Sequence, residues 1–262
     1  MEILLGFLVV SVIGFVLSIV LSLAAHFMRV EENETVKKVR GALPGVNCGA
    51  CGYSGCDEYA KAIAEKKEKI NLCIPGADAV SGEIANIMGT EFEDVVEMVA
   101  YVHCNGNCEA TGANAHYDGQ MPCRAANMLY GGPGKCRFGC LGCGDCARAC
   151  PVNAICLKDG IAHINPEICI GCGLCTKDCP KGIISLVPQI SKVWVMCSNE
   201  DKGAAAMKVC KNACIACKKC ESVCPSGAIK VENGLARINY ELCTACGKCV
   251  EACPTKCIHS EN

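Results

Sequence analysis

The chain has 262 residues, a formal net charge of −2 and 28 cysteines. Its near-neutral charge and the lack of a long basic run exclude a general nucleic-acid-binding protein. Large apolar side chains are sparse after the first thirty residues, which excludes one or two domains with ordinary hydrophobic cores. We therefore expect metal centres to supply much of the core, with folding coupled to metal insertion.

The N-terminal stretch over residues 3–25 is almost wholly apolar and is long enough to span a bilayer. Three serines interrupt it, and each can hydrogen-bond back into its own helix: Ser11, Ser18 and Ser22. A cleaved signal peptide would need a basic start and a shorter apolar segment, whereas Glu2 is the only charged residue before this run. We predict a retained single-pass transmembrane helix over residues 1–28, with a buried helix as the alternative.

The basic residues near this stretch all follow it: Arg29, Lys37, Lys38 and Arg40. The positive-inside rule then places the rest of the chain on the cytoplasmic side of the cytoplasmic membrane. The reducing cytosol also favours thiolate-bound metal clusters over disulfides.

Residues 29–100 are expected to form a small separate domain. Its four cysteines follow the spacing C-x2-C-x4-C-x16-C: Cys48, Cys51, Cys56 and Cys73. The glycines between them let the backbone fold around a [4Fe–4S] cluster and aim amides at its sulfurs. Residues 57–70 have the periodicity of an amphipathic helix that leads to the fourth ligand, and residues 77–103 predict a short helix, a turn at Gly89 and then a helix or strand. A structural zinc site is the alternative.

Two tandem modules carry the run C-x2-C-x2-C-x3-C-P twice each, over residues 137–189 and 211–262, with an offset of 74 residues between them. In bacterial ferredoxins the first three cysteines of such a run bind one [4Fe–4S] cluster, and the fourth binds the other cluster of the pair. The predicted ligand sets are Cys140, Cys143, Cys146 and Cys179; Cys169, Cys172, Cys175 and Cys150; Cys214, Cys217, Cys220 and Cys253; and Cys243, Cys246, Cys249 and Cys224. A disulfide framework or zinc knuckles fit four such runs poorly.

The connector over residues 101–136 contains four further cysteines, Cys104, Cys108, Cys123 and Cys136. One interpretation is a sixth [4Fe–4S] cluster held by all four. The other is a structural role, because at the repeat offset only Cys123 and Cys136 have equivalents, Cys197 and Cys210, and two thiols cannot complete a cluster.

The second connector, residues 190–210, predicts a strand over 190–197 and a helix over 201–208. The cysteines outside the ligand sets, Cys156, Cys197, Cys210 and Cys257, are interpreted as small hydrophobic residues, and Cys257, near the C-terminus, is expected to be more exposed than Cys156. The apolar pairs after each run predict short strands around the clusters.

The predicted fold class is therefore α+β: a transmembrane helix, a small [4Fe–4S] domain and two tandem 2[4Fe–4S] ferredoxin modules. No phosphate-cradling loop, nucleophile–base arrangement or flavin motif is present, so we predict no catalytic residue and no NAD site in the chain itself. Five clusters are expected, with a possible sixth.

Over nearly its full length the sequence resembles the B subunit of the Rnf complex, an ion-translocating ferredoxin:NAD oxidoreductase of membranes. The resemblance rests on the anchor followed by Gly45-Val-Asn-Cys-Gly-Ala-Cys-Gly-Tyr-Ser-Gly-Cys56 and by the ferredoxin runs. The two modules are typical of the longer form of the family. The resemblance implies electron transfer from soluble ferredoxin through flavin- and NAD-binding partner subunits to NAD, coupled to sodium or proton export.

Two other functions are compatible with the residues. A membrane-anchored iron–sulfur protein could reduce a redox-sensing regulator or store iron and sulfide, and a similar polypeptide could serve another membrane reductase. A partner with NAD activity would distinguish these from the first interpretation.

Overall fold

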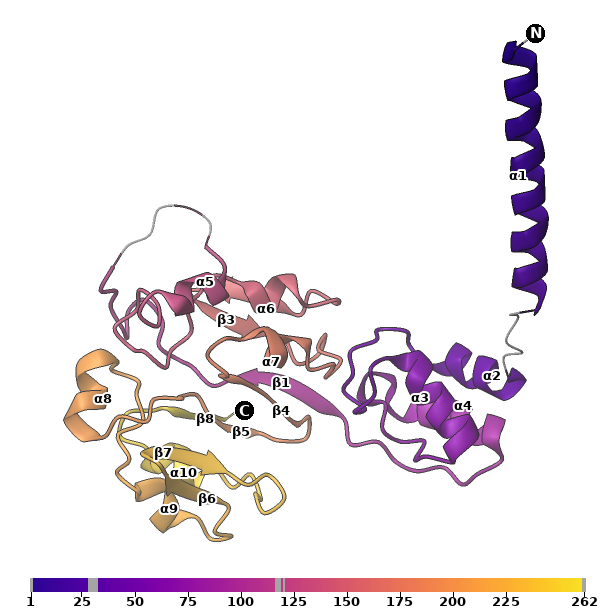
Figure 1. Cartoon of the computed structure of the whole chain (residues 1–262). Coiled ribbons are helices and arrows are strands. Elements are labelled where there is room, and N and C mark those ends of the chain that lie inside the picture. Colours follow the sequence, from indigo (N-terminus) through magenta and orange to yellow (C-terminus); the bar gives the residue numbers. More distant parts are fainter. Residues whose placement is uncertain (1, 28–32, 116–118, 120, 261–262) are drawn as a thin grey trace.

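The computed structural model describes residues 2–27, 33–115, 119 and 121–260. A long helix, a small helical domain and two α/β modules follow one another along the chain (Figure 1). The first helix, α1 (Glu2–Phe27), has described side chains at residues 6, 8 and 11–24 only. Within the described residues, no helix is both long enough and apolar enough to cross a membrane.

The N-terminal domain consists of α2 (Glu34–Ala42), α3 (Cys56–Lys66), a 3₁₀ turn (Ile74–Gly76) and α4 (Ala77–Met88). Its core buries Val39, Tyr59, Ile63 and Ile84 between the three helices. Tyr59 also pins the segment before Cys73, because its hydroxyl donates to the Lys69 carbonyl (2.7 Å) and accepts from the Leu72 amide (3.1 Å).

Two helices of this domain end at residues with positive φ. α3 ends before the expected residue 70, because Lys67 (φ 54) turns the chain out of the helix and its N–H bonds the carbonyl of Ala62. α4 ends before Gly89 (φ 66), which adopts this conformation without a Cβ clash. The predicted short helix and turn are thus confirmed.

Module 1 begins with a strand far upstream of its first predicted cluster ligand. β1 (Met98–Val102) pairs antiparallel with β4 (Ile184–Pro188), with Val102 opposite Ile184. Between them lie α5 (Cys123–Met128), α6 (Asp145–Arg148), the hairpin β2 (Ile155–Lys158) and β3 (Ile161–Ile164), and α7 (Leu174–Asp178). The structure thus selects the strand over the helix for the segment after Gly89, and β1 straddles the expected boundary at residue 100.

Module 2 repeats this order. β5 (Val193–Val195) pairs antiparallel with β8 (Ile258–Ser260). Between them lie α8 (Gly203–Val209), α9 (Lys219–Val223), the hairpin β6 (Ile229–Glu232) and β7 (Leu235–Ile238), and α10 (Lys248–Ala252). The strand and the helix predicted between the modules are confirmed as β5 and α8.

The two modules are held together by the segments that follow β1 and β5. His103 bonds the Val195 carbonyl (2.8 Å) through Nδ1 and the Ser185 hydroxyl (2.6 Å) through Nε2. The Asn105 amide donates to the Met196 carbonyl (3.0 Å), and the Asn105 carbonyl accepts from Asn212 Nδ2 (2.8 Å). These bonds place the residues just after β1 beside those just after β5.

Candidate metal centres

Module 2 gathers each of its predicted ligand sets around a cavity. Cys214, Cys217, Cys220 and Cys253 line one, and Cys224, Cys243, Cys246 and Cys249 line the other. The third cysteine of each run lies in a short helix, Cys220 in α9 and Cys249 in α10, so that the chain leaves the cavity directly after three ligands. The fourth then reaches the neighbouring cavity, as expected for paired clusters.

Cys257 is a fifth cysteine at the first of these cavities. The expectation that it is exposed is wrong, because it is 2 % exposed where the chain enters β8. Its sulfur lies 3.6 Å from that of Cys253. Hydrogen bonding by the Cys257 thiol lowers the pKa of Cys253 to about 5 and that of Cys214 to about 6. Cys257 is thus poised to donate to sulfur at this site.

Module 1 also brings the members of its predicted sets close together. Cys140, Cys146 and Cys179 line one cavity, and Cys143 adjoins Cys140 and Cys123. The second set gathers around Cys175, whose pKa is raised to about 12 by burial and then by the negative charges of Cys169, Cys172, Cys146 and Cys150. Because Cys146 belongs to the first set, the two sets of this module are neighbours.

In the N-terminal domain the four predicted ligands meet beside α3. Cys51, Cys56 and Cys73 contact its core, and burial together with the charges of Cys56, Cys48 and Cys51 raises the pKa of Cys73 to about 11. The preceding loop is held by Asn47, whose side-chain oxygen accepts from the Cys56 amide (2.8 Å).

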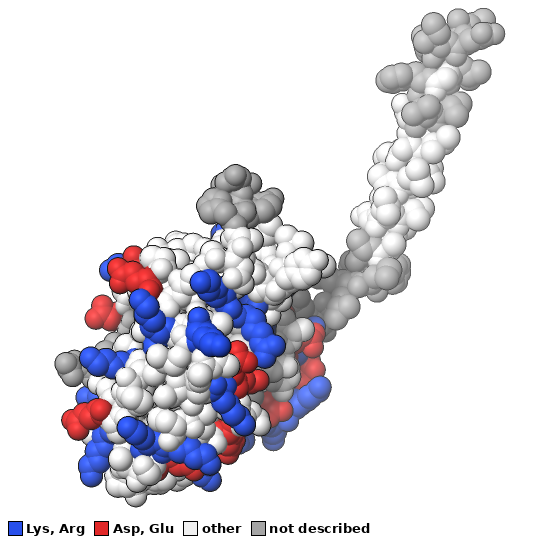
Figure 2. Space-filling model, turned by 90° about the vertical axis from the view of Figure 1, so that its left-hand side faces the viewer, with Lys and Arg blue, Asp and Glu red and all other residues white. Residues whose placement is uncertain are grey.

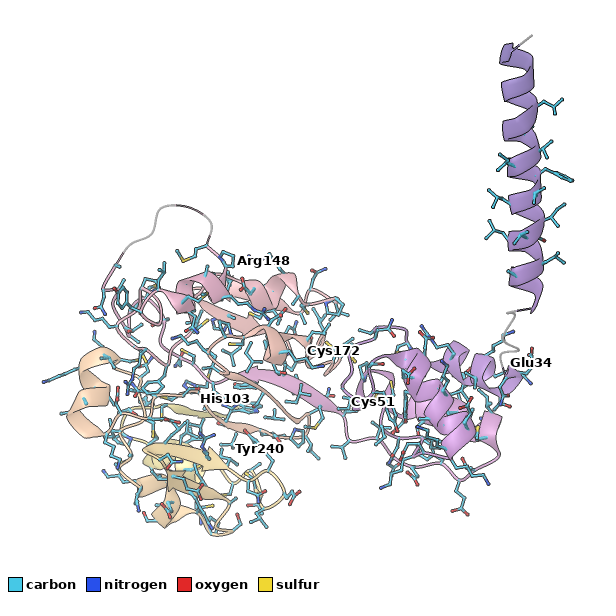
Figure 3. The ribbon with its side chains drawn as sticks, in the orientation of Figure 1. Glu34, Cys51, His103, Arg148, Cys172 and Tyr240 are labelled. Carbon is cyan, nitrogen blue, oxygen red and sulfur yellow. The ribbon has the colours of Figure 1, made fainter. Side chains whose placement is uncertain are left out.

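This domain abuts the second cysteine set of module 1. Lys177 Nζ donates to the Cys48 carbonyl (2.8 Å), and Cys48 is among the groups whose charge, after burial, raises the pKa of Cys172. Cys51 and Cys172 lie on the facing sides of the two units (Figure 3).

At Gly171 (φ 63) a Cβ would lie 2.3 Å from the Met98 carbonyl oxygen, so the close approach of β1 requires glycine.

A further cavity lies between the modules and is lined by four cysteines: Cys104, Cys136, Cys197 and Cys210. Each module contributes two of them. The Cys104 sulfur accepts from the Gly106 and Cys140 amides (both 3.4 Å), and the Cys197 sulfur accepts from the Asn199 (3.4 Å) and Cys214 (3.2 Å) amides. The arrangement is therefore repeated on the two sides, and each side leads directly to the first ligand of its own module.

The structure does not bring the four connector cysteines together. Cys104 and Cys136 lie at the cavity between the modules, whereas Cys108 is exposed and its amide bonds the Asp159 carbonyl (3.0 Å). Cys123 lines the cavity of Cys140, Cys146 and Cys179. Cys156 is exposed on β2.

The constant offset of 74 residues concealed the equivalence of Cys104 and Cys197. Cys104 comes two residues after β1 ends, and Cys197 two residues after β5 ends. The segment from Cys104 to Cys136 is longer than the segment from Cys197 to Cys210, so a gap-free comparison aligned Cys123 with Cys197 instead. An alignment that allowed an insertion before the ferredoxin runs would have found the pair.

The donor set fits iron–sulfur clusters. Backbone amides that donate to cysteine sulfurs favour the thiolate form that binds iron. Besides the bonds to Cys104 and Cys197, the Ala154 amide donates to the Cys150 sulfur (3.3 Å) and the Ala100 amide donates to the Cys169 sulfur (3.4 Å). Burial raises the pKa of Cys104 to about 11 and that of Cys197 to about 12, so metal binding here must displace protons. No group of three or more His, Cys, Asp or Glu in the described part of the chain is placed to hold a single metal ion.

The fold and these cysteine sets define an iron–sulfur electron-transfer protein built from tandem ferredoxin modules. A family model for an Fe-S cluster matches residues 43–75, and models for a 4Fe-4S dicluster domain match residues 139–183, 168–229 and 206–254. The matched segments cover the N-terminal set and both modules.

Three relatives extend the likeness to most of the chain. The B subunit of the Na(+)-translocating ferredoxin:NAD(+) oxidoreductase complex of Acetobacterium woodii is 43% identical over 89% of this chain and 70% of its own length. Its counterpart in the proton-translocating complex of Clostridium ljungdahlii is 42% identical (89% and 83%), and that in the ion-translocating oxidoreductase complex of Methanosarcina acetivorans is 38% identical (89% and 89%). The chain belongs to this family, the B subunits of the Rnf-type ion-translocating ferredoxin:NAD oxidoreductases.

Proposed function

We propose that the chain is a six-centre electron wire that carries electrons from reduced ferredoxin toward NAD within a membrane complex. Five [4Fe–4S] clusters are held by the sets predicted from the four runs and the N-terminal motif. The sixth is held by Cys104, Cys136, Cys197 and Cys210. The observation that carries the proposal is this last set, because it joins two modules that would otherwise be separate two-cluster units.

The contacts between neighbouring sets support one order of centres. Starting from the N-terminal domain, Cys48 adjoins Cys172, and Cys146 adjoins Cys175 within module 1. The Cys140 amide then bonds the Cys104 sulfur, and the Cys214 amide bonds the Cys197 sulfur. The wire therefore runs from the N-terminal set through module 1 and the inter-module centre to module 2. Each ferredoxin module includes its upstream strand, β1 or β5.

The sequence carries no motif typical of an NAD site, so we propose that NAD is reduced at a partner subunit, with the flavin- and NAD-binding subunits of the complex as the partners. The names of the relatives include both sodium and proton translocation, and either ion fits this chain, because the wire itself moves only electrons.

Helix α1 is the proposed membrane anchor, with the cluster domains on the cytoplasmic side. The run of apolar residues over 3–25 supports it, and the apolar side chains described in α1 are exposed, among them Leu8, Phe15 and Leu21. Ser18 Oγ donates to the Phe15 carbonyl (2.8 Å), so the serine hydroxyl has a hydrogen-bond partner that lipid chains could not supply. Full-length protein should resist extraction from membranes by alkaline carbonate, whereas residues 29–262 should remain in solution.

The function is tested by mixing the anaerobic full-length protein with reduced ferredoxin and following the visible absorbance of the clusters. Rapid bleaching of several clusters is expected, and NADH alone should leave them oxidised. Within the assembled complex, NAD should be reduced only when this chain is present. A protein that ferredoxin does not reduce, and that releases its iron readily to a chelator, would instead be a store of iron and sulfide.

A further inference from the structure

Around the cavity of Cys214, Cys217, Cys220 and Cys253, module 2 carries lysines where module 1 does not. The three positions are Lys218, Lys219 and Lys256. The residues 74 positions earlier, at the equivalent site of module 1, are Gly144, Asp145 and Gly182. The two modules share their fold and ligand spacing, so module 1 serves as an internal comparison in which the predicted ligands are kept and these three positions carry no lysine.

The backbone at two of these lysines has a conformation that favours glycine. Lys218 has φ 60 and Lys256 has φ 51, and at the equivalent positions Gly144 has φ 81 and Gly182 has φ 61. A side chain in this left-handed region is strained, and module 2 accepts the same strain at Ala216 (φ 55) and Ala245 (φ 54), where module 1 has Gly142 and Gly171. The positive charge of the lysines, and not the loss of glycine, is therefore what distinguishes this site. Lys218 lines the cavity beside Cys217 and Cys253.

The lysines are also free to meet a partner. All three are exposed, and none forms an ion pair with another residue in the described part of the chain. Cys217 beside them is exposed, whereas its module 1 counterpart Cys143 is partly buried. A predicted cluster ligand of module 2 is thus exposed beside the three lysines.

The charge is not confined to this triplet. Residues 211–256 contain seven Lys and Arg against four Asp and Glu, while the equivalent residues 137–182 contain five against four. Figure 1 places module 2 in the lower part of the body, away from the N-terminal domain, and Figure 2 shows blue side chains, with red ones among them, over that part of the face. The N-terminal domain is at the other end of the wire, with an acidic balance of eleven Asp and Glu to seven Lys and Arg over residues 33–100.

We propose that Lys218, Lys219 and Lys256 form the docking surface for the soluble electron donor, an acidic ferredoxin, and that electrons enter the wire at the centre of Cys214, Cys217, Cys220 and Cys253. This inference rests on the proposed function. One electron passes from the ferredoxin, which is oxidised, to the centre of module 2, which is reduced; no proton or group is transferred. Opposite charges speed the encounter and orient the two proteins with their centres close together.

Two variants of the full-length protein test the surface. Lys218→Gly/Lys219→Asp/Lys256→Gly copies module 1: it removes two positive charges, replaces the third with a negative one, and relieves the backbone strain at positions 218 and 256. Lys218→Glu/Lys219→Glu/Lys256→Glu reverses the charges. The matched control, Lys66→Glu/Lys158→Glu/Lys208→Glu, makes the same change in net charge at three exposed lysines that form no ion pair among the described residues. Iron content equal to that of the wild type confirms that each variant is intact.

Stopped-flow mixing with a reduced, net acidic 2[4Fe–4S] ferredoxin measures the second-order rate of cluster reduction. At low ionic strength both docking variants should be slower than the wild type, the charge-reversed one by about tenfold or more, and the difference should shrink at high salt. The control should stay close to the wild type. Reduced methyl viologen, a small cation, should reduce all four proteins without loss of rate in the docking variants.

The outcomes separate this inference from the proposed function. If ferredoxin fails to reduce even the wild type while methyl viologen succeeds, the proposed function is refuted. If ferredoxin reduces the wild type and both docking variants equally well at every ionic strength, the wire stands but this docking surface is wrong. Unchanged ferredoxin kinetics combined with loss of the variants from the membrane complex would assign the lysines to a contact within that complex and overturn the proposal as well.

Discussion

The inter-module centre predicts a specific loss of iron in the variant Cys104→Ala/Cys197→Ala. The change removes one ligand from each module at the cavity that holds Cys104, Cys136, Cys197 and Cys210. Six four-cysteine sets at four irons each give about 24 irons per chain, so the variant should hold about 20, with a matching loss of acid-labile sulfide. The five remaining sets keep all their ligands.

The matched control is Cys108→Ala/Cys123→Ala, which removes the two connector cysteines that the structure places elsewhere. It should keep about 24 irons. Iron and sulfide are measured anaerobically on the full-length chain, together with the protein concentration by amino-acid analysis. The reasoning is refuted if the control loses about four irons and the Cys104/Cys197 variant loses none, because the connector would then bind its own cluster.

Three further predictions concern tuning and stability. Cys257→Ile, which copies Ile183 of module 1, removes a thiol hydrogen-bond donor worth about 1 kcal/mol. The reduction potential of the adjacent cluster, measured by a redox titration with electron paramagnetic resonance, should therefore fall by about 40 mV. An unchanged potential would assign Cys257 a packing role only. Gly171→Ala should lower the free energy of unfolding by about 2 kcal/mol or more in denaturant titrations, because the new Cβ would meet the Met98 carbonyl. The control Gly182→Ala has a similar φ but open space around it, so it should lower the free energy of unfolding by about 1 kcal/mol. Equal losses in the two variants would contradict the argument. Tyr59→Phe loses both bonds of the hydroxyl and should lower stability by about 1–3 kcal/mol, with the N-terminal cluster lost first on heating; intact retention of that cluster would contradict it.

The parts of the site predictable from sequence are those set by local spacing. The first three cysteines of a run, such as Cys214, Cys217 and Cys220, line one cavity within seven residues, so the local spacing indicates that they meet. The same holds for α4, whose end is determined by Gly89, and for the strand and helix between the modules.

The parts that were missed depend on contacts between distant segments. Cys104 reaches Cys197 only because β1 pairs with β4 and the residues after β1 bond those after β5, and no periodicity in the sequence encodes that contact. Cys257 was expected near the surface because it lies close to the C-terminus, but the pairing of β8 with β5 buries it. Pairing across long loops is specified by the assembled core, so sequence patterns predict it poorly.

The shared cavity between the modules also bears on how such a protein could have arisen. Each module contributes only two cysteines to this cavity: Cys104 and Cys136 come from module 1, and Cys197 and Cys210 from module 2. Two thiolates are too few to hold a [4Fe–4S] cluster. Gene duplication would therefore have created a cofactor site that neither copy possessed. If the proposed inter-module cluster is present, it can be inserted only after both modules have folded and docked, because a chain that ends after the first module would have only two of its four ligands.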